Sequence, residues 1–175
     1  MSAARTLLNR MPRPTPVKPA SNQESVWDYP RPPRLERTTK TLRVDFAGEV
    51  LAQSARAWRV LETSHPPVYY IPREDVDMDL LTPSAGSTNC EWKGAAQYFD
   101  AVVGERRAEQ CAWTYPRPVK AFEPIAGHFA FYAARVDACY VDGILVEAQP
   151  GNFYGGWITP DVVGPFKGGP GSWGW

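Results

Sequence analysis

The chain contains 175 residues with 19 basic and 19 acidic side chains, a length that suits one domain with its own hydrophobic core. Because the charges balance, no overall field favours nucleic acid or an anionic membrane surface, and we expect neither as a partner. No apolar run approaches the roughly 18 residues that a membrane span requires, so we expect a soluble protein.

The composition favours β-structure. Aromatic residues make up 13% of the chain, together with 18 prolines and 14 glycines. This mixture suits short strands and tight turns better than a bundle of helices. We therefore predict a mainly β protein, with a single domain of antiparallel sheets and short helical turns.

The cysteines of the chain are Cys90, Cys111 and Cys139. Neither a Cys-x-x-Cys nor a His-x-x-x-His spacing occurs, so we predict no metal site and no cofactor. The odd number of cysteines and the lack of a secretory signal favour a reducing, cytoplasmic compartment.

The start of the chain is basic, rich in proline and free of acidic side chains until Glu24. Proline removes backbone donors and favours an extended coil, so we predict a disordered tail over residues 1–24. Two alternatives are an organelle-targeting segment and a true start at Met11.

We expect a single β-rich domain over residues 25–175. It begins with an extended arm over residues 25–40, where two aromatic residues lie among prolines that exclude a helix or a central strand. It ends in a segment rich in glycine and aromatic residues over 150–175, which lacks the pattern of a phosphate-binding loop.

The first strands of the domain follow from alternation. Apolar and polar residues alternate from Leu42 to Phe46, which predicts a half-buried strand. In the next candidate strand Trp58, Val60 and Glu62 share a face, which places the Glu62 carboxylate on the buried side. A buried carboxylate must be paired or protonated, so Glu62 is either a structural ion-pair partner or a functional group.

Two prolines lead into a short strand that carries Tyr69 and Tyr70. A helical turn is predicted at residues 72–75, because proline comes first and acidic residues follow. Residues 75–79 alternate aspartates with apolar residues, a pattern that nucleotidyltransferases also show. Those enzymes place a Gly-Ser turn upstream, whereas the Gly-Ser pair of this chain follows the acids. We therefore predict a solvated acidic edge.

The longest hairpin is predicted after a loop over residues 83–89. Its strands span 90–103 and 106–115, around a turn at Gly104 and Glu105. Alternation along the first strand predicts that Lys93 lies on the same face as Ala95 and Gln97 and points away from Trp92.

Pairing from the two residues that flank this turn sets Tyr98 opposite Cys111, an aromatic ring facing a small side chain. The same register sets Asp100 opposite Glu109, and two like charges facing each other are unfavourable. The sequence therefore leaves the register of the outer part of the hairpin open.

The last third of the chain has three more predicted elements. Residues 118–127 form a short helix or a loop, and residues 128–136 form a strand. A second hairpin spans residues 138–147 around Asp142 and Gly143, because Asp-Gly is a preferred pair in type I′ turns.

Two stretches, residues 62–70 and 89–94, concentrate polar and aromatic groups beside predicted strands. A small-molecule cleft has aromatic walls and a few convergent polar groups, and we predict such a cleft between the sheets. Its expected binding residues are Glu62, His65, Tyr69, Tyr70, Cys90, Lys93, Trp113, Tyr132 and Trp157.

Two other functions remain open. The first is a metal-independent enzyme that uses Lys93 and Glu62 for acid/base or covalent chemistry, since a lysine in an apolar cleft can lose its proton. In a variant of this hypothesis Cys90 is the nucleophile and His65 its base. The second is a protein-interaction module that uses the proline-rich arm and exposed tryptophans.

Several motifs of the chain together resemble the domain of unknown function 427 family. They are Trp-Asp-Tyr-Pro-Arg-Pro at 27–32, Glu-Thr-Ser-His-Pro-Pro-Val-Tyr-Tyr at 62–70, Cys-Glu-Trp-Lys-Gly at 90–94 and Phe-Tyr-Gly-Gly-Trp-Ile-Thr at 153–159. The resemblance covers about residues 25–175.

This resemblance implies a β-tent fold, in which antiparallel sheets meet at a steep angle around a central cleft. Relatives of that architecture include methionine sulfoxide reductase B, glutathione-dependent formaldehyde-activating enzymes and the thalidomide-binding domain of cereblon. Many of them bind zinc through paired Cys-x-x-Cys knuckles, which this chain lacks. The resemblance therefore carries no zinc-dependent activity over to this chain, and a fold does not assign a function.

Overall fold

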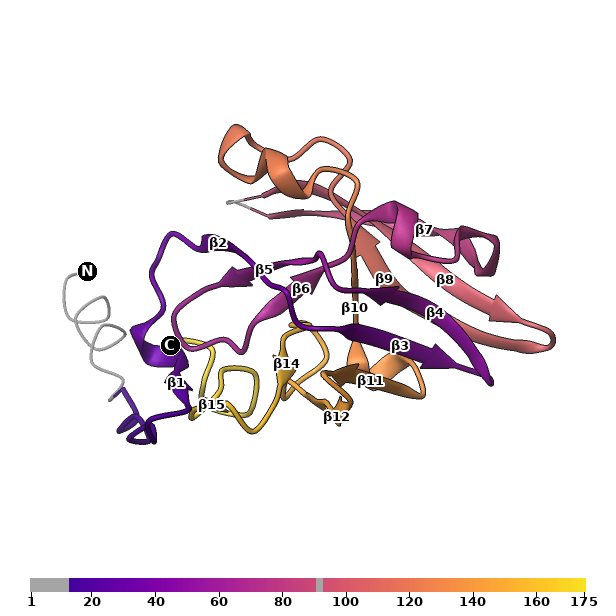
Figure 1. Ribbon diagram of the computed structural model, residues 1–175. Helices are drawn as coiled ribbons and strands as arrows, with labels where there is room; N and C mark the ends of the chain where they lie inside the picture. The colour runs from indigo at the N-terminus through magenta and orange to yellow at the C-terminus, as the bar shows by residue number, and fades with distance from the viewer. Residues whose placement is uncertain (1–12, 91–92) are drawn as a thin grey trace.

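The computed structural model describes residues 13–90 and 93–175. It confirms the predicted fold class, a mainly β protein of antiparallel sheets with short helical turns (Figure 1). Over these residues, no helix has the length and apolar character needed to cross a membrane. The helices are 3-10 turns: η1 (Val26–Asp28), η2 (Arg73–Asp75), η3 (Met78–Leu80), η4 (Lys120–Ile125) and η5 (Ala133–Arg135).

The sheet with the longest strands contains the predicted long hairpin. In spatial order its strands are β10 (Phe129–Phe131), β9 (Arg106–Thr114), β8 (Gly94–Val103) and β7 (Leu81–Cys90).

The prediction of a loop over residues 83–89 was wrong, because β7 runs through it. Proline and glycine usually interrupt strands, but here they lie at a register shift between Pro83 and Ser87 on an edge strand, where the ladder tolerates them. Cys90 therefore ends β7, where it pairs with Gly94 across the hairpin. Strand β8 begins only at Gly94, so the strand alternation used to orient Lys93 does not extend to it.

The register of the β8–β9 hairpin was predicted correctly near its turn, where Val103 pairs with Arg106. Farther from the turn the prediction was wrong. A bulge shifts the register, and Tyr98 lies opposite Trp113 instead of Cys111.

The physical reason for the bulge lies at Asp100, whose carboxylate accepts hydrogen bonds from the Gln110 backbone N–H (2.8 Å) and from Arg107 (2.7 Å). Gln110 adopts a φ of +46°, a left-handed conformation that lets its N–H turn toward the carboxylate. The bulge thus replaces the unfavourable pairing of Asp100 with Glu109 by a charge-assisted hydrogen bond.

A second sheet contains, in spatial order, β12 (Ile144–Leu145), β11 (Ala138–Val141), β3 (Leu42–Phe46) and β4 (Glu49–Ser54). The predicted hairpin between β11 and β12 is confirmed. Its turn residues Asp142 and Gly143 have φ values of +49° and +76°, as a type I′ turn requires.

A third sheet contains β2 (Arg34–Arg37), β5 (Trp58–Leu61) and β6 (Val68–Tyr70). A β-bridge between Ile71 and Phe129 joins the end of β6 to β10. Two short pairs complete the ladders: β1 (Glu24–Ser25) with β15 (Val162–Val163), which is parallel, and β13 (Glu147–Ala148) with β14 (Trp157–Ile158).

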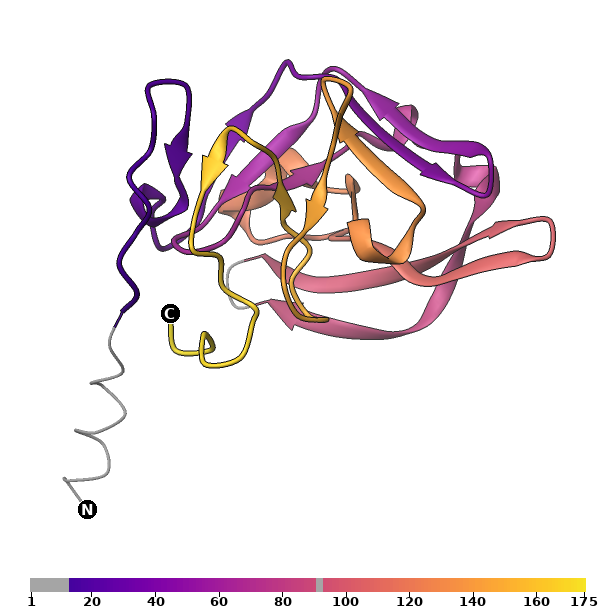
Figure 2. The same ribbon diagram turned by 90° about the horizontal axis from the view of Figure 1, so that it is seen from below.

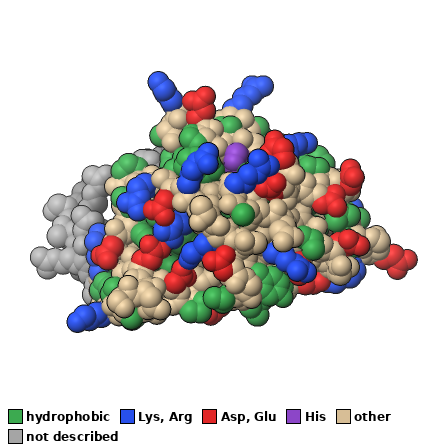
Figure 3. All heavy atoms as spheres, viewed as in Figure 1, with side chains coloured by type: hydrophobic (Ala, Val, Ile, Leu, Met, Phe, Trp, Pro, Cys, Tyr) green, Lys and Arg blue, Asp and Glu red, His purple; other side chains and the backbone are tan. Residues whose placement is uncertain are grey.

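The β1–β15 pairing brings segments from the two ends of the sequence together, as Figure 2 shows for the indigo and yellow strands. The Val17 backbone N–H also donates to the Gly164 carbonyl (2.8 Å). The part of the predicted tail in residues 1–12 lies outside the described residues, whose side chains Figure 3 colours by type.

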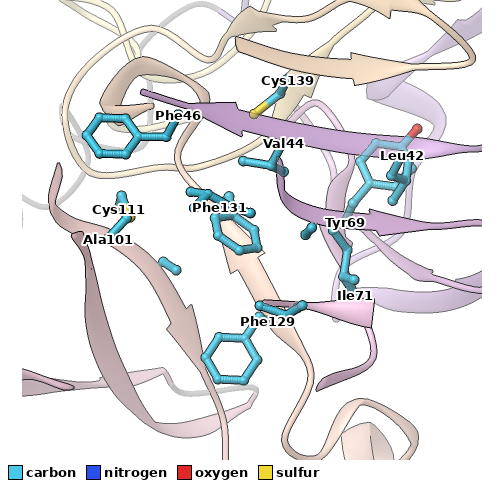
Figure 4. Close-up of a cluster of buried hydrophobic side chains, with 14 of the residues drawn as sticks. Leu42, Val44, Phe46, Tyr69, Ile71, Ala101, Cys111, Phe129, Phe131 and Cys139 are labelled. Carbon is cyan, nitrogen blue, oxygen red and sulfur yellow. The ribbon is translucent and has the colours of Figure 1, made fainter. Parts of the chain in front are cut away.

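The main core lies where the three sheets converge (Figure 4). Phe129 and Phe131 of β10 meet Tyr69 and Ile71 from the β6 segment there, and each is at most 3% exposed. A second cluster, which includes Tyr70, packs on the other face of the same strands. Because side chains alternate along a strand, neighbouring residues of β6 and β10 contribute to different clusters.

Candidate functional site

A cavity of about 380 Å³ lies between the β2–β5–β6 sheet and the β10–β9–β8–β7 sheet, and Gln149 and residues 153–155 also line it. The residues that line it are Val60, Glu62, His65, Val68, Tyr70, Thr88, Asn89, Cys90, Lys93, Tyr98, Trp113, Tyr115, Tyr132, Gln149, Phe153, Tyr154 and Gly155.

Most of the predicted binding residues line this cavity. They are Glu62, His65, Tyr70, Cys90, Lys93, Trp113 and Tyr132. Glu91 and Trp92, which complete the motif around Cys90, lie outside the described residues.

The other two predicted binding residues, Tyr69 and Trp157, are not brought to the cavity. Their rings pack against each other in the main core with centroids 5.3 Å apart, and they are 3% and 1% exposed. The Trp157 indole N–H donates to the Phe131 carbonyl (2.9 Å), which satisfies its polar atom inside the core.

Aromatic rings from several strands form the cavity wall. The Trp113 indole N–H donates to the Tyr70 hydroxyl (3.2 Å), and the Tyr132 ring centroid lies 4.5 Å from that of Trp113. Burial raises the pKa of Tyr132 to about 12 and also raises the pKa of Tyr70 and Tyr115. These phenols are therefore neutral at physiological pH and can donate and accept hydrogen bonds.

The sequence predictions missed several residues of the wall. Tyr115 lies two residues after Trp113, so alternation along β9 was a usable signal that both face the same side. Tyr98 lies opposite Trp113 only in the bulged register, which the sequence left open. Tyr154 and Gln149 come from the glycine-rich end of the chain, and only the tertiary fold places them beside the cavity.

Gly155 is required by the close approach of Trp113. A Cβ at this position would lie 2.3 Å from the Trp113 ring atom Cη2, far inside van der Waals contact. The neighbouring Tyr132 hydroxyl donates to the Phe153 carbonyl (3.1 Å) and so ties the same segment to the wall. The glycine therefore lets the closing segment lie directly against the indole.

Glu62 lies at a tight turn after β5. The His65 backbone N–H donates to the Glu62 carbonyl (3.0 Å), and Ser64 adopts a φ of +71°. One Glu62 carboxylate oxygen lies 3.5 Å from the Arg31 guanidinium and 3.6 Å from the His65 Nδ1. Glu62 therefore has an ion-pair partner and also lines the cavity, so both sequence interpretations of this carboxylate have structural support.

His65 is neutral in this setting. Burial lowers its pKa from the usual 6.5, more than the nearby Glu62 carboxylate raises it. Its Nδ1 lies 2.9 Å from the Thr63 carbonyl, which can only accept, so Nδ1 carries the proton. The Nε2 atom is then an unprotonated acceptor. The ring packs edge-on against Tyr154 with centroids 4.8 Å apart.

Lys93 extends over aromatic rings. Its Nζ lies 5.9 Å from the Tyr115 ring centroid and 5.8 Å from that of Phe122, which is within the range of a cation–π contact. The Val119 backbone N–H donates to the Lys93 carbonyl (3.1 Å) and fixes the turn that presents this side chain.

The cysteines differ in access. Cys90 is partly exposed and lines the cavity, whereas Cys111 and Cys139 are buried. Burial raises the pKa of Cys111 to about 11 and also raises the pKa of Cys139. Cys90 is therefore the thiol that a reagent in the cavity meets.

Hydrogen bonds fix Asp75, the first residue of the acidic edge that was predicted over residues 75–79. Asp75 accepts from the Arg56 guanidinium (2.9 and 3.0 Å) and from the Ser54 hydroxyl (2.6 Å), and the Arg56 bonds lower its pKa. Among residues 13–90 and 93–175, no three His, Cys, Asp or Glu side chains gather as metal ligands would.

The fold and the cavity define a class of protein, a mainly β protein with an aromatic-lined cavity between its sheets. The family model described as a domain of unknown function (DUF427) matches residues 34–142. The chain belongs to this family. A search of curated proteins found no match. The matched stretch carries the strand walls of the cavity, and residues 149–155 lie beyond it.

Proposed function

We propose that the protein binds a small organic molecule in the cavity between the β2–β5–β6 and β7–β10 sheets. The observation that carries this proposal is the concentration of aromatic rings and of a few polar groups around one cavity. Its volume of about 380 Å³ lies toward the lower end of the roughly 300–1,000 Å³ that ligand pockets span. A compact ligand of one or two rings suits this size.

The polar groups that line the cavity can orient such a ligand. The β5–β6 connection contributes Glu62 and His65, and the β7–β8 hairpin contributes Asn89 and Lys93. Polar groups on facing elements can fix which way a flat ligand lies between the rings. The neutral phenols add donors and acceptors without adding charge.

The test uses Cys90 as a reporter. We expect 2-naphthamide, a flat neutral probe, to slow alkylation of Cys90 by iodoacetamide in the native full-length chain, as followed by mass spectrometry. Native mass spectrometry of the freshly purified protein, compared with its denatured mass, should reveal any organic molecule that copurifies.

Two variants separate the cavity from the rest of the surface. Trp113→Leu removes a ring of the wall and should abolish the protection of Cys90, whereas Trp173→Leu changes an exposed tryptophan that does not line the cavity and should preserve it. Thermal unfolding checks that both variants fold. An alkylation rate that no neutral, anionic or cationic naphthalene probe changes would overturn the proposal.

A second candidate, metal-independent catalysis, is favoured by one observation. Cys90, which is partly exposed, and His65, whose Nε2 is unprotonated, line the same cavity, as do Lys93 and Glu62. If the imidazole activates the thiol, His65→Gln should slow Cys90 alkylation at neutral pH. An unchanged rate in a folded His65→Gln protein would remove this pair from consideration.

A further inference from the structure

Lysine and arginine side chains of the protein lie over several aromatic rings of the cavity wall. Each of these lysines and arginines is half-buried. The pairs are Arg135 over Tyr132 (3.9 Å from guanidinium carbon to ring centroid), Lys167 over Tyr154 (5.6 Å from Nζ) and Lys93 over Tyr115 (5.9 Å from Nζ).

Arg135 and Lys93 form no ion pair with a side-chain carboxylate in the part of the chain that the structure describes. Arg135 donates to the backbone carbonyls of Gln110 and Asn152, at 2.8 Å each. These backbone carbonyls satisfy the donors of Arg135 but leave its positive charge in place.

The acidic group among the described lining residues is Glu62, and the Arg31 guanidinium lies 3.5 Å from its carboxylate. This pair contributes no net charge. The charges that remain at the cavity among the described residues are those of Lys93, which lines the cavity, and Arg135, which lies over the Tyr132 ring. Both are positive.

This arrangement discriminates between ligands by charge. A ring face attracts cations, but cations of the protein already lie over the rings of Tyr115, Tyr132 and Tyr154. A ligand cation beside these rings would lack this attraction and would be repelled. Charge interactions are stronger in a partly desolvated cavity than in water, so an anion gains where a cation loses.

We infer that the cavity selects a flat aromatic molecule that carries an anionic group, a carboxylate or a phosphate. The aromatic part lies against the rings of the wall, and Lys93, the cation among the described lining residues, contacts the anionic group. This inference rests on the cavity being a binding site, as proposed above.

The test compares probes that share one ring system and differ in charge. They are 2-naphthoate, 2-naphthyl phosphate, neutral 2-naphthamide and cationic 2-naphthylmethylamine. Calorimetry on the full chain measures each affinity, and protection of Cys90 from alkylation locates each probe in the cavity. We expect at least one anion to bind about tenfold more tightly than the amide, and the amine to bind most weakly. The tighter anion identifies carboxylate or phosphate as the preferred group.

Variants of Lys93 test its proposed contact with the anionic group of the ligand. Lys93→Met should reduce the affinity for the anion to that of the amide, while Lys93→Arg should retain the preference because it keeps the charge. Lys120→Met is the matched control, since Lys120 is exposed on η4 and does not line the cavity. An anion preference that survives Lys93→Met would overturn the role of Lys93.

The other outcomes separate this inference from the proposed function. If the anions and the amide protect Cys90 and bind equally, the charge inference fails and the binding proposal stands. The inference also fails if the amine binds most tightly. If no probe binds or protects Cys90, both fail.

Discussion

The two faces of the same strands carry different chemistry. On the core face of β8 and β10 lie Phe99, Phe129 and Phe131, whereas the cavity face presents Tyr98 and, just after β10, Tyr132. Phenylalanine has no polar atom and can pack in a dry core, but a buried tyrosine hydroxyl needs a partner. On β8 and β10, rings without hydroxyls thus lie where the packing is close and rings with hydroxyls where a cavity is left, whereas β6 carries a tyrosine on each face.

The largest expected effect is a difference in lost stability between a substitution on the core face and one on the cavity face. Phe129→Ala on the core face should destabilise the protein by about 3–5 kcal/mol, because it leaves a cavity in a packed core. Tyr98→Ala on the cavity face should cost only about 1–2 kcal/mol, because its side chain is partly exposed. Urea unfolding measures both. Equal losses would contradict the distinction between a packed face and an open one.

The next effect concerns the contact between the closing segment and the wall. Gly155→Ala should destabilise the protein by about 1–3 kcal/mol and weaken probe protection of Cys90, because the new Cβ overlaps the Trp113 ring. Gly174→Ala is the matched control, since nothing lies within 4 Å of its Cβ position. Thermal unfolding and alkylation rates give the two readouts, and a Gly155→Ala protein that matches the control in both would contradict the prediction.

A smaller effect depends on pH. Burial lowers the pKa of His65 below the value of 6.5 for an exposed histidine. The unfolded chain therefore binds this proton more readily, so the contribution of His65 to stability is full well above pH 6.5. It falls as the pH drops from there toward the lower folded-state pKa. His65→Gln should flatten this part of the stability profile, and His128→Gln, which changes the other histidine, should not. Denaturant unfolding between pH 7.5 and 5 would show the difference or its absence.

The smallest effect on stability is expected from Arg31→Gln. The side chains of Arg31 and Glu62 are 37% and 21% exposed, and pairs of this kind contribute less than about 1 kcal/mol. The same change leaves the Glu62 charge without its partner, so the affinity for 2-naphthoate should fall several-fold. Calorimetry beside urea unfolding would reveal whether stability and binding respond separately.

The sequence predicts best the parts of the fold that depend on local chemistry. The hairpin at Asp142 and Gly143 follows from the φ values that a type I′ turn demands. The strand over residues 83–89 was missed because its proline and glycine are tolerated only on an edge strand, and edge position is a property of the assembled sheet. The bulge depends on Asp100 finding the Gln110 N–H, a contact that no turn rule predicts.

The candidate site was predictable to a similar extent. Residues 62–70 and 89–94 drew attention because polar and aromatic groups lie together there in sequence. Tyr69 and Tyr70 are indistinguishable in type, yet alternation sends one to the core and the other to the cavity. Which face is the cavity depends on how two sheets pack, and only the structure determines that. Tyr154 reaches the site from the far end of the sequence for the same reason.

The segment over residues 149–155 connects the short strands β13 and β14 and lines the cavity without joining either of the facing sheets. Its Phe153 side chain is 70% exposed. A library randomised at Phe153 would therefore change the lining of the cavity while the strand ladders stay the same. Under the proposed function, this position would let ligand selectivity be evolved in the laboratory without a change to the sheets.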